Sequence, residues 1–111
     1  MWCNHQLGEL VERAHDLQTR ATVWIINPQD PASTARFKQK RAAPFTFLCD
    51  EDLKVIDQYG IYHLQHEAHG HIPYPVTFLI KPDGTLAWRF LGLKPRDRPQ
   101  VQEIIQALDA L

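Results

Sequence analysis

The strongest constraint on the fold is a continuous apolar run in the first quarter of the chain. Residues 21–26 read Ala-Thr-Val-Trp-Ile-Ile and are rich in β-branched and aromatic side chains. Such a run is typical of a strand buried on both faces, and these strands lie in parallel sheets covered by helices. We therefore predict a sheet with helical layers on both sides and with Trp24 in its core.

Helix-like and strand-like segments alternate along the rest of the chain. The apolar spacing and the breakers predict a helix over about residues 3–19, a polar helix of about two turns that follows Asp30-Pro31 and ends before Pro44, and helices over about 50–60 and 97–111. Strands are predicted over 21–26, 45–49, 76–80 and 85–90. Asp30 and Asp50 are N-cap residues for the second and third helices, and Gly60 is placed to end the third in a left-handed conformation. The Pro-Asp-Gly turn at 82–84 joins the last two strands as a hairpin. This order predicts a three-layer α/β domain.

Size and charge exclude several classes of function. With 111 residues and a net charge of −1, the chain is one domain without the basic surface that nucleic acid or an anionic membrane would require. It contains no apolar run long enough to span a bilayer. Its two cysteines form no disulfide framework. We expect a cytoplasmic protein with free thiols and no cofactor.

The first helix begins with a cysteine. Trp2 and Cys3 stand at its start, where backbone N–H groups and the helix dipole favour a negative charge. These groups lower the pKa of a thiol and favour its thiolate, the reactive form. A protonated His5 would stabilise the thiolate further, although it also fits an exposed position in the first turn.

Two further sets of residues have a functional and a structural interpretation. Cys49 ends a predicted strand and is a second thiol candidate, although a small buried side chain is the expected role. A loop over about residues 62–74 contains four histidines, which are common metal ligands: His63, His66, His69 and His71. Their spacing matches no closed zinc motif, so we expect a polar surface loop and no metal.

Four segments resemble a known family. Residues 2–10, Trp-Cys-Asn-His-Gln-Leu-Gly-Glu-Leu, are similar to the Trp-Cys-x-x-Cys-x-x-Glu-Leu of the alkyl hydroperoxide reductase and thiol-specific antioxidant (AhpC/TSA) family, a redoxin and peroxiredoxin-like group in the thioredoxin-like superfamily. Residues 45–50 resemble its strand ending in Leu-x-Asp, and residues 59–61 its Tyr-Gly-Val. Residues 75–84 resemble its Pro-Ala-Thr-Phe-x-Ile-Asp-x-Asp-Gly. Together these segments cover nearly the whole chain in the family's order.

The resemblance implies a single domain over residues 1–111 with a thioredoxin-like three-layer αβα sandwich. Its mixed sheet ends in a C-terminal hairpin and helix, and Pro75 is cis beside the active cysteine. The family's central strand precedes its Trp-Cys, so the domain is expected to be truncated and its sheet incomplete at the N-terminus. A homodimer would fill the gap between residues 23–26 and 76–80.

The resemblance also implies a thiol-dependent oxidoreductase in which Cys3 attacks a peroxide or a disulfide. Gln6 stands where the dithiol members have their resolving cysteine, so an external thioredoxin-like or glutathione-like thiol must regenerate Cys3. Pro75 and Val76 would shape the substrate edge beside Trp2 and Gln6. The alternative is a redox-inactive binding module that retains only the fold.

Overall fold

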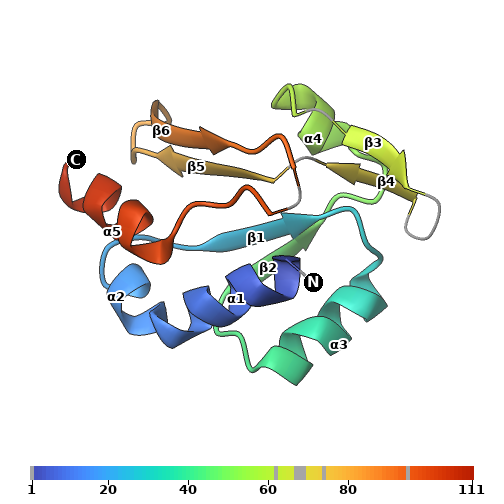
Figure 1. Cartoon of the computed structure of the whole chain (residues 1–111), viewed down its shortest axis with the longest axis horizontal. Coiled ribbons are helices and arrows are strands. Elements are labelled where there is room, and N and C mark those ends of the chain that lie inside the picture. The colour runs from blue at the N-terminus through green and yellow to red at the C-terminus, as the bar shows by residue number, and fades with distance from the viewer. Residues whose placement is uncertain (1, 62, 67–69, 74, 95) are drawn as a thin grey trace. The chain divides into compact units, whose positions relative to one another are not determined.

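The computed structural model describes residues 2–61, 63–66, 70–73, 75–94 and 96–111, and their side chains except at 2–4, 63–66 and 70–73. The elements in chain order are α1 (Trp2–Glu12), α2 (Ala14–Gln18), β1 (Trp24–Asn27), α3 (Pro31–Arg41), β2 (Thr46–Cys49), α4 (Lys54–Gln58), β3 (His63–His66), β4 (Gly70–Pro73), β5 (Val76–Ile80), β6 (Leu86–Leu91) and α5 (Val101–Asp109) (Figure 1). They form two compact units. The terminal unit comprises Met1–Thr22 and Pro75–Leu111, and the central unit comprises Val23–Tyr74.

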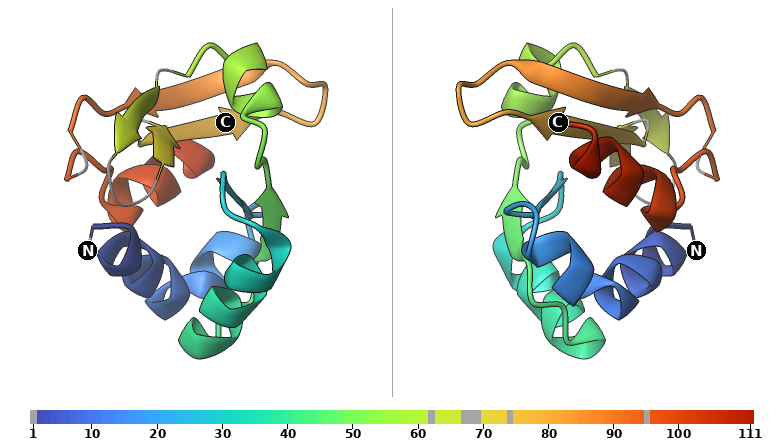
Figure 2. Two further views of the ribbon diagram at one scale, coloured as in Figure 1. Left: turned by 90° about the vertical axis from the view of Figure 1, so that its right-hand side faces the viewer. Right: turned by 90° about the vertical axis from the view of Figure 1, so that its left-hand side faces the viewer.

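The terminal unit is built on a hairpin and three helices. β5 and β6 pair antiparallel, with Val76 opposite Leu91, and Gly84 takes a φ of 90° in the turn between them. The predicted hairpin is therefore confirmed. In the two views of Figure 2, α5 lies beside this hairpin. The buried apolar side chains of the unit come from α1, α2, β5 and α5: Leu7, Leu10, Leu17, Leu79, Val101, Ile104 and Ile105.

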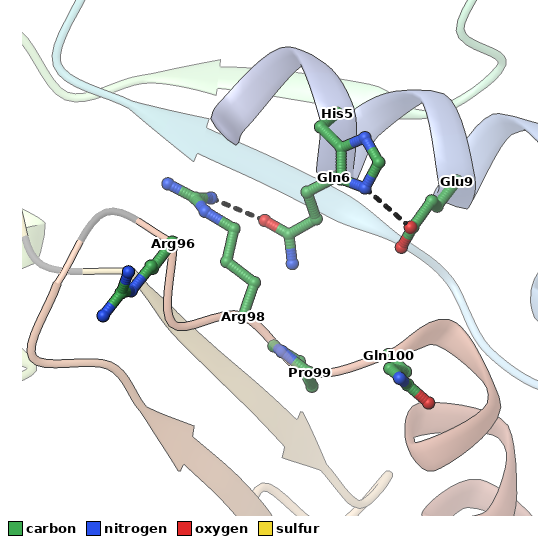
Figure 3. A pocket seen from close by; sticks show the side chains of 7 residues that line it. All are labelled: His5, Gln6, Glu9, Arg96, Arg98, Pro99 and Gln100. Atoms are coloured by element: carbon green, nitrogen blue, oxygen red, sulfur yellow. Dashed lines mark hydrogen bonds and ion pairs between the residues drawn. The ribbon is translucent and has the colours of Figure 1, made fainter. Parts of the chain in front are cut away.

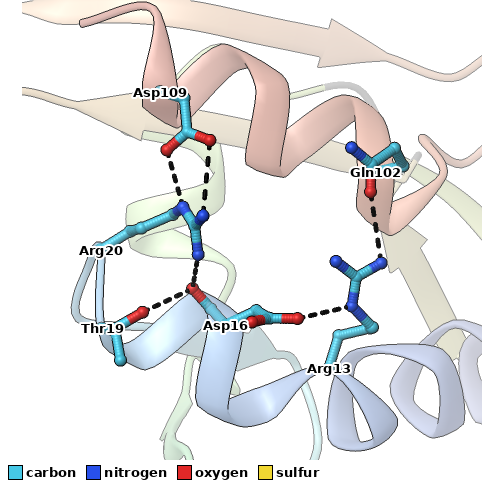
Figure 4. Close-up of polar contacts among 6 residues, drawn as sticks. All are labelled: Arg13, Asp16, Thr19, Arg20, Gln102 and Asp109. Atoms are coloured by element: carbon cyan, nitrogen blue, oxygen red, sulfur yellow. Dashed lines mark hydrogen bonds and ion pairs between the residues drawn. The ribbon is translucent and has the colours of Figure 1, made fainter.

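Polar side chains join the first helices to the last one. Arg20 donates from Nε to Oδ1 of Asp109 at 2.7 Å, and Arg13 donates from Nη1 to Oε1 of Gln102 at 3.3 Å (Figure 4). Arg13 also donates from Nε to Asp16 at 2.8 Å. The contacts of Arg20 with Asp109 and of Arg13 with Gln102 each connect residues 89 apart in sequence. They hold α2 and α5 together within the unit.

The central unit contains a parallel pair of strands, and helix α3 connects the first strand to the second along the chain. β1 pairs with β2 in register from Trp24 opposite Thr46 to Asn27 opposite Cys49. The α3 helix packs on β2, where the rings of Phe37 and Phe47 meet edge to face at 6.3 Å.

Several of the predicted helix ends in the central unit are confirmed. The carboxylate of Asp30 accepts a hydrogen bond from the backbone N–H of Ser33 at 2.8 Å, as expected of an N-cap. Gly60 has a φ of 70°, the predicted left-handed conformation. The third helix starts later than predicted, at Lys54, because Leu53 takes a positive φ of 59°. Asp50 nevertheless caps it, since its carboxylate accepts the N–H groups of Val55 and Ile56.

Trp24 does not lie in the core as predicted. It is 62% exposed, and exposed and half-buried residues alternate along β1. In the described part of the chain, the strands form three separate two-stranded sheets, β1–β2, β3–β4 and β5–β6. A sheet of two strands is too narrow to bury both of its faces, so the prediction of a doubly buried strand at 21–26 is wrong.

Two other segments differ from the sequence prediction. The helix expected over 3–19 is interrupted at Arg13, whose φ of −108° and ψ of 21° separate α1 from α2. The segment expected to be a histidine-rich loop contains an antiparallel pair, with His63 opposite Pro73 and His66 opposite Gly70.

Stability is expected to fall in acid because three carboxylates are hydrogen-bonded in the folded protein. The pKa of Asp16 is lowered by Arg13, that of Asp30 by the backbone and hydroxyl of Ser33, and that of Asp83 by Thr85. A lowered pKa in the folded state adds stability above the unfolded pKa, and this stability is lost as the pH falls below about 4. Urea unfolding at pH 5 and pH 3 measures the loss. Replacing all three aspartates by asparagine should make the dependence shallower, and an unchanged dependence would contradict this assignment.

Candidate functional site

The N-terminal turn of α1 contains the cysteine on which the sequence analysis centred. The helix begins at Trp2, so the backbone of Cys3 lies in its first turn, as predicted. The first turn carries no acidic side chain. The free N–H groups and the dipole at this end of α1 therefore favour an anion without an opposing carboxylate.

A pocket lies beside this turn, within the terminal unit. It has a volume of about 210 Å³ and is lined by residues of α1 and of the segment before α5: His5, Gln6, Glu9, Arg96, Arg98, Pro99 and Gln100 (Figure 3). The guanidinium of Arg98 reaches α1, where its Nη1 donates to Oε1 of Gln6 at 2.6 Å. On the other side of the pocket, Nε2 of His5 lies 2.9 Å from Oε1 of Glu9. The pocket therefore has two arginines at one side and a histidine–carboxylate pair at the other.

The segment that carries Arg98 is held by its own backbone. Gly92 donates from its N–H to the carbonyl of Pro75 at 2.8 Å, which fixes the start of the segment to the start of β5. Further along, Oδ2 of Asp97 accepts the N–H groups of Leu93 and Lys94 at 3.1 and 3.0 Å. These bonds close the turn that leads to Arg98. They connect two of the predicted site positions, because the segment contacts Pro75 at one end and Gln6 at the other.

Gly92→Ala should disturb this connection. A Cβ atom at residue 92 would lie 2.5 Å from the carbonyl oxygen of Asp97 and 2.6 Å from Cγ of Pro75. Because neither atom is the end of a flexible side chain, the backbone must move, and we expect a loss of about 1–3 kcal/mol in the free energy of unfolding. Urea unfolding measures it. Gly8→Ala is the matched control, because a Cβ there meets nothing within 4 Å, and alanine in a helix should stabilise the protein. A Gly92→Ala protein as stable as the parent would contradict the proposed close contact.

The structure brings some of the predicted site residues together. Gln6 lies in the pocket, and Pro75 and Val76 stand at the start of β5, where Pro75 contacts Gly92. The side chain of His5 is 67% exposed and directed to Glu9. The side chains of Trp2 and Cys3 lie outside the described ones. The bond before Pro75 includes Tyr74, also outside the described residues, so the cis form stays a prediction.

Arg96 and Arg98 were missed by the sequence analysis, which treated Asp97 and Pro99 only as a helix start. The sequence signal for them was a basic residue at every second position before the last helix: Lys94, Arg96 and Arg98. That spacing predicts a local positive patch. It does not predict contact with Gln6, which is 92 residues away in the chain.

Cys49 is exposed, so the prediction of a small buried residue is wrong. β1 is the only strand paired with β2 in the described part of the chain, and most of β2 is exposed. The thiol of Cys49 donates to the hydroxyl of Thr34 at 3.3 Å, and that hydroxyl donates to Asn27 at 3.2 Å. Cys49 is therefore a free surface thiol of the central unit.

The histidines considered as metal ligands lie in a segment whose side chains the structure does not describe. Among the described residues, no three His, Cys, Asp or Glu side chains are placed to hold a metal ion. His69 and the side chains of His63, His66 and His71 lie outside this part of the chain. In the same described part, none of the helices has the length and apolar character of a membrane span.

The fold and the cysteine at the start of α1 define a thioredoxin-like α/β domain. Residues 1–89 match the model of the AhpC/TSA family, and the chain belongs to this family. A curated relative, the putative peroxiredoxin bcp of Haemophilus influenzae, is 28% identical over an alignment of 103 residues that covers 89% of this chain and 66% of the relative.

Solved structures confirm the predicted fold. The peroxidoxin BcpB of Mycobacterium tuberculosis superposes with a TM-score of 0.83 at 18% identity, over 98% of this chain and 70% of that one. The reduced Prx3 of Vibrio vulnificus, in complex with H₂O₂, gives a TM-score of 0.81 at 14% identity, over 94% of this chain and 66% of that one. The chain thus spans about two thirds of these relatives.

Proposed function

We propose that the chain is a thiol-dependent peroxidase with Cys3 as its reactive thiol. The observation that carries the proposal is the position of Cys3 in the first turn of α1 in an AhpC/TSA family member. The Cys3 thiolate attacks one oxygen of a peroxide, the O–O bond breaks, and Cys3 becomes a sulfenic acid. The other oxygen leaves with its electron pair and is protonated to water or an alcohol.

The electrostatics of the terminal unit support a reactive Cys3. Free N–H groups of the first turn stabilise its thiolate, and the guanidinium of Arg98 is anchored to Gln6, one helical turn after Cys3. Both effects favour the charged form, so we expect a lowered pKa for the Cys3 thiol.

Regeneration requires an external thiol. Gln6, three residues after Cys3, is an amide engaged by Arg98 and provides no sulfur. A first thiol therefore displaces water from the sulfenic acid and forms a mixed disulfide, and a second thiol releases Cys3. Thioredoxin-like and glutathione-like thiols are the proposed reductants. Pro75 and Val76 form the proposed substrate edge with Trp2. The imidazole of His5 would stabilise the Cys3 thiolate when His5 is not bound to Glu9.

Cys49 is the second thiol of the proposal. Because it is exposed and free, it is open to an external oxidant or to a thiol of another molecule. A free surface thiol also persists best in a reducing compartment, which supports the proposed cytoplasmic location. A homodimer is part of the same proposal, and light scattering over a range of concentrations measures it.

The test is direct oxidation. The reduced protein is mixed with one equivalent of H₂O₂ in the presence of a sulfenic-acid trap, and the modified residue is located by mass spectrometry. We expect the trap on Cys3, formed faster than on an unfolded peptide with residues 1–12. Labelling no faster than that of the peptide would favour the alternative, a redox-inactive module that retains the fold.

A further inference from the structure

The pocket beside α1 carries opposite charges on its two sides. Arg96 and Arg98 line one side of it, and the negative charge of Glu9 lies beside His5, 2.9 Å away. Arg98 is partly buried and fixed by its bond to Gln6. The arginine side therefore presents a preorganised positive charge to whatever enters.

The size of the pocket limits the occupant. A volume of about 210 Å³ is roughly that of seven water molecules in the liquid. It admits a small organic acid but no folded partner. Guanidinium groups bind carboxylates through paired N–H donors, so a carboxylate is the group that this side recognises best.

The position of the pocket relates this occupant to Cys3. His5 and Gln6 both line the pocket and follow Cys3 by two and three residues, so the backbone of Cys3 lies within one helical turn of the lining, an axial rise of about 5.4 Å. The proposed occupant therefore carries its carboxylate at one end and its sulfur a few bonds away. Peroxide itself has no carboxylate for this side of the pocket to bind.

We infer that the Arg96–Arg98 side of the pocket selects small thiols and disulfides that bear a carboxylate for exchange with Cys3. The inference rests on the proposed function and names the class of its thiol partner. In the exchange, the Cys3 thiolate attacks one sulfur of the disulfide and a new S–S bond forms. The second sulfur leaves as a thiolate, and no other oxidant or reductant is required.

The test compares two disulfides that both have two methylene groups between the sulfur and the polar group. It uses a Cys49→Ser protein, so that Cys3 is the single thiol. 3,3′-Dithiodipropionate is anionic, and bis(2-hydroxyethyl) disulfide is neutral. Formation of the mixed disulfide with Cys3 is followed by mass spectrometry. For each disulfide, this rate is divided by the rate at which the same disulfide reacts with 2-mercaptoethanol, and the quotient is the normalised rate. We expect the normalised rate to be about tenfold higher for the anionic reagent, which corresponds to one charge-assisted contact. The ratio should fall at high salt.

Arginine variants then assign the preference to the pocket. Arg96→Gln and Arg98→Gln should each lower the anionic-to-neutral ratio about threefold, and Arg98→Lys should retain most of it. Arg36→Gln on α3 removes one charge outside the pocket and should leave the ratio unchanged. A general effect of Arg98 on the Cys3 thiolate, or on folding of the variant, changes the rates with both disulfides by the same factor. Such an effect therefore cancels in the ratio of the two rates.

The outcomes separate the two proposals. If Cys3 reacts with both disulfides at equal normalised rates, the inference is overturned and the proposed function stands. If Cys3 reacts with neither faster than a free thiol does, both are overturned. A preference that survives in the Arg96→Gln and Arg98→Gln double variant also overturns the inference, because the selectivity then lies elsewhere.

Discussion

Cys3→Ser should reduce thiol-dependent peroxide consumption by about a hundredfold or more. A serine hydroxyl keeps the size of the side chain but is a far weaker nucleophile, and without the thiolate no sulfenic acid forms. The remaining residues at the start of α1 and around the pocket supply charge and position, which cannot replace the attacking sulfur. The loss is measured as the rate of H₂O₂ consumption with dithiothreitol in excess.

Cys49→Ser is the matched control, because it removes the other thiol of the chain by the same exchange of sulfur for oxygen. Cys49 lies on β2 in the central unit and bonds to Thr34, so its replacement should leave most of the activity. The reverse result, with activity lost in Cys49→Ser and kept in Cys3→Ser, would show that Cys49 is the peroxide-reducing thiol.

Phe45→Ala should cause the largest loss of stability. Phe45 is 1% exposed and is one of the largest fully buried side chains in the described structure, immediately before β2. Its truncation removes apolar contacts and leaves a cavity, which costs about 3–5 kcal/mol in the free energy of unfolding. Since small domains are stable by about 5–15 kcal/mol, the variant is expected to be partly unfolded at 37 °C. Urea unfolding followed by circular dichroism measures the change.

Thr46→Ala tests whether burial is the cause. Thr46 is the neighbouring residue and is exposed on β2, so its replacement should change stability by no more than about 0.5 kcal/mol. If Phe45→Ala costs less than about 1.5 kcal/mol, the surroundings of Phe45 close over the space, and the core of the central unit is more adaptable than the structure implies.

The positions of most elements were predictable because their signals are local. The hairpin follows from two apolar runs and the turn between them, and the predicted strands differ from β5 and β6 by one residue at most. Asp30 and Gly60 act through bonds and dihedral angles within a few residues of themselves. The break at Arg13 was missed because the apolar spacing continues through it to Leu17.

Burial and long-range contacts were harder to predict, and for a physical reason. The apolar run that contains Trp24 predicts a strand, but it does not predict which elements lie beside that strand. The exposure of Trp24 depends on how many strands and helices cover it. The same applies to Cys49 on β2. The contact between Gln6 and Arg98 depends on how the chain returns after β6 to the start of α1. The pocket could be recognised only once those two segments were brought together.

The amide at Gln6 has a consequence for how this site can change. One substitution, Gln6→Cys, would restore the spacing of a dithiol pair at the start of α1, but it would also remove the acceptor that holds Arg98 at 2.6 Å. Residue 6 can therefore be a cysteine that reduces Cys3 within the chain, or a glutamine that holds the guanidinium of Arg98, but not both. Under the proposed function, glutamine at this position leaves the reduction of Cys3 to an outside thiol and keeps the guanidinium of Arg98 in place.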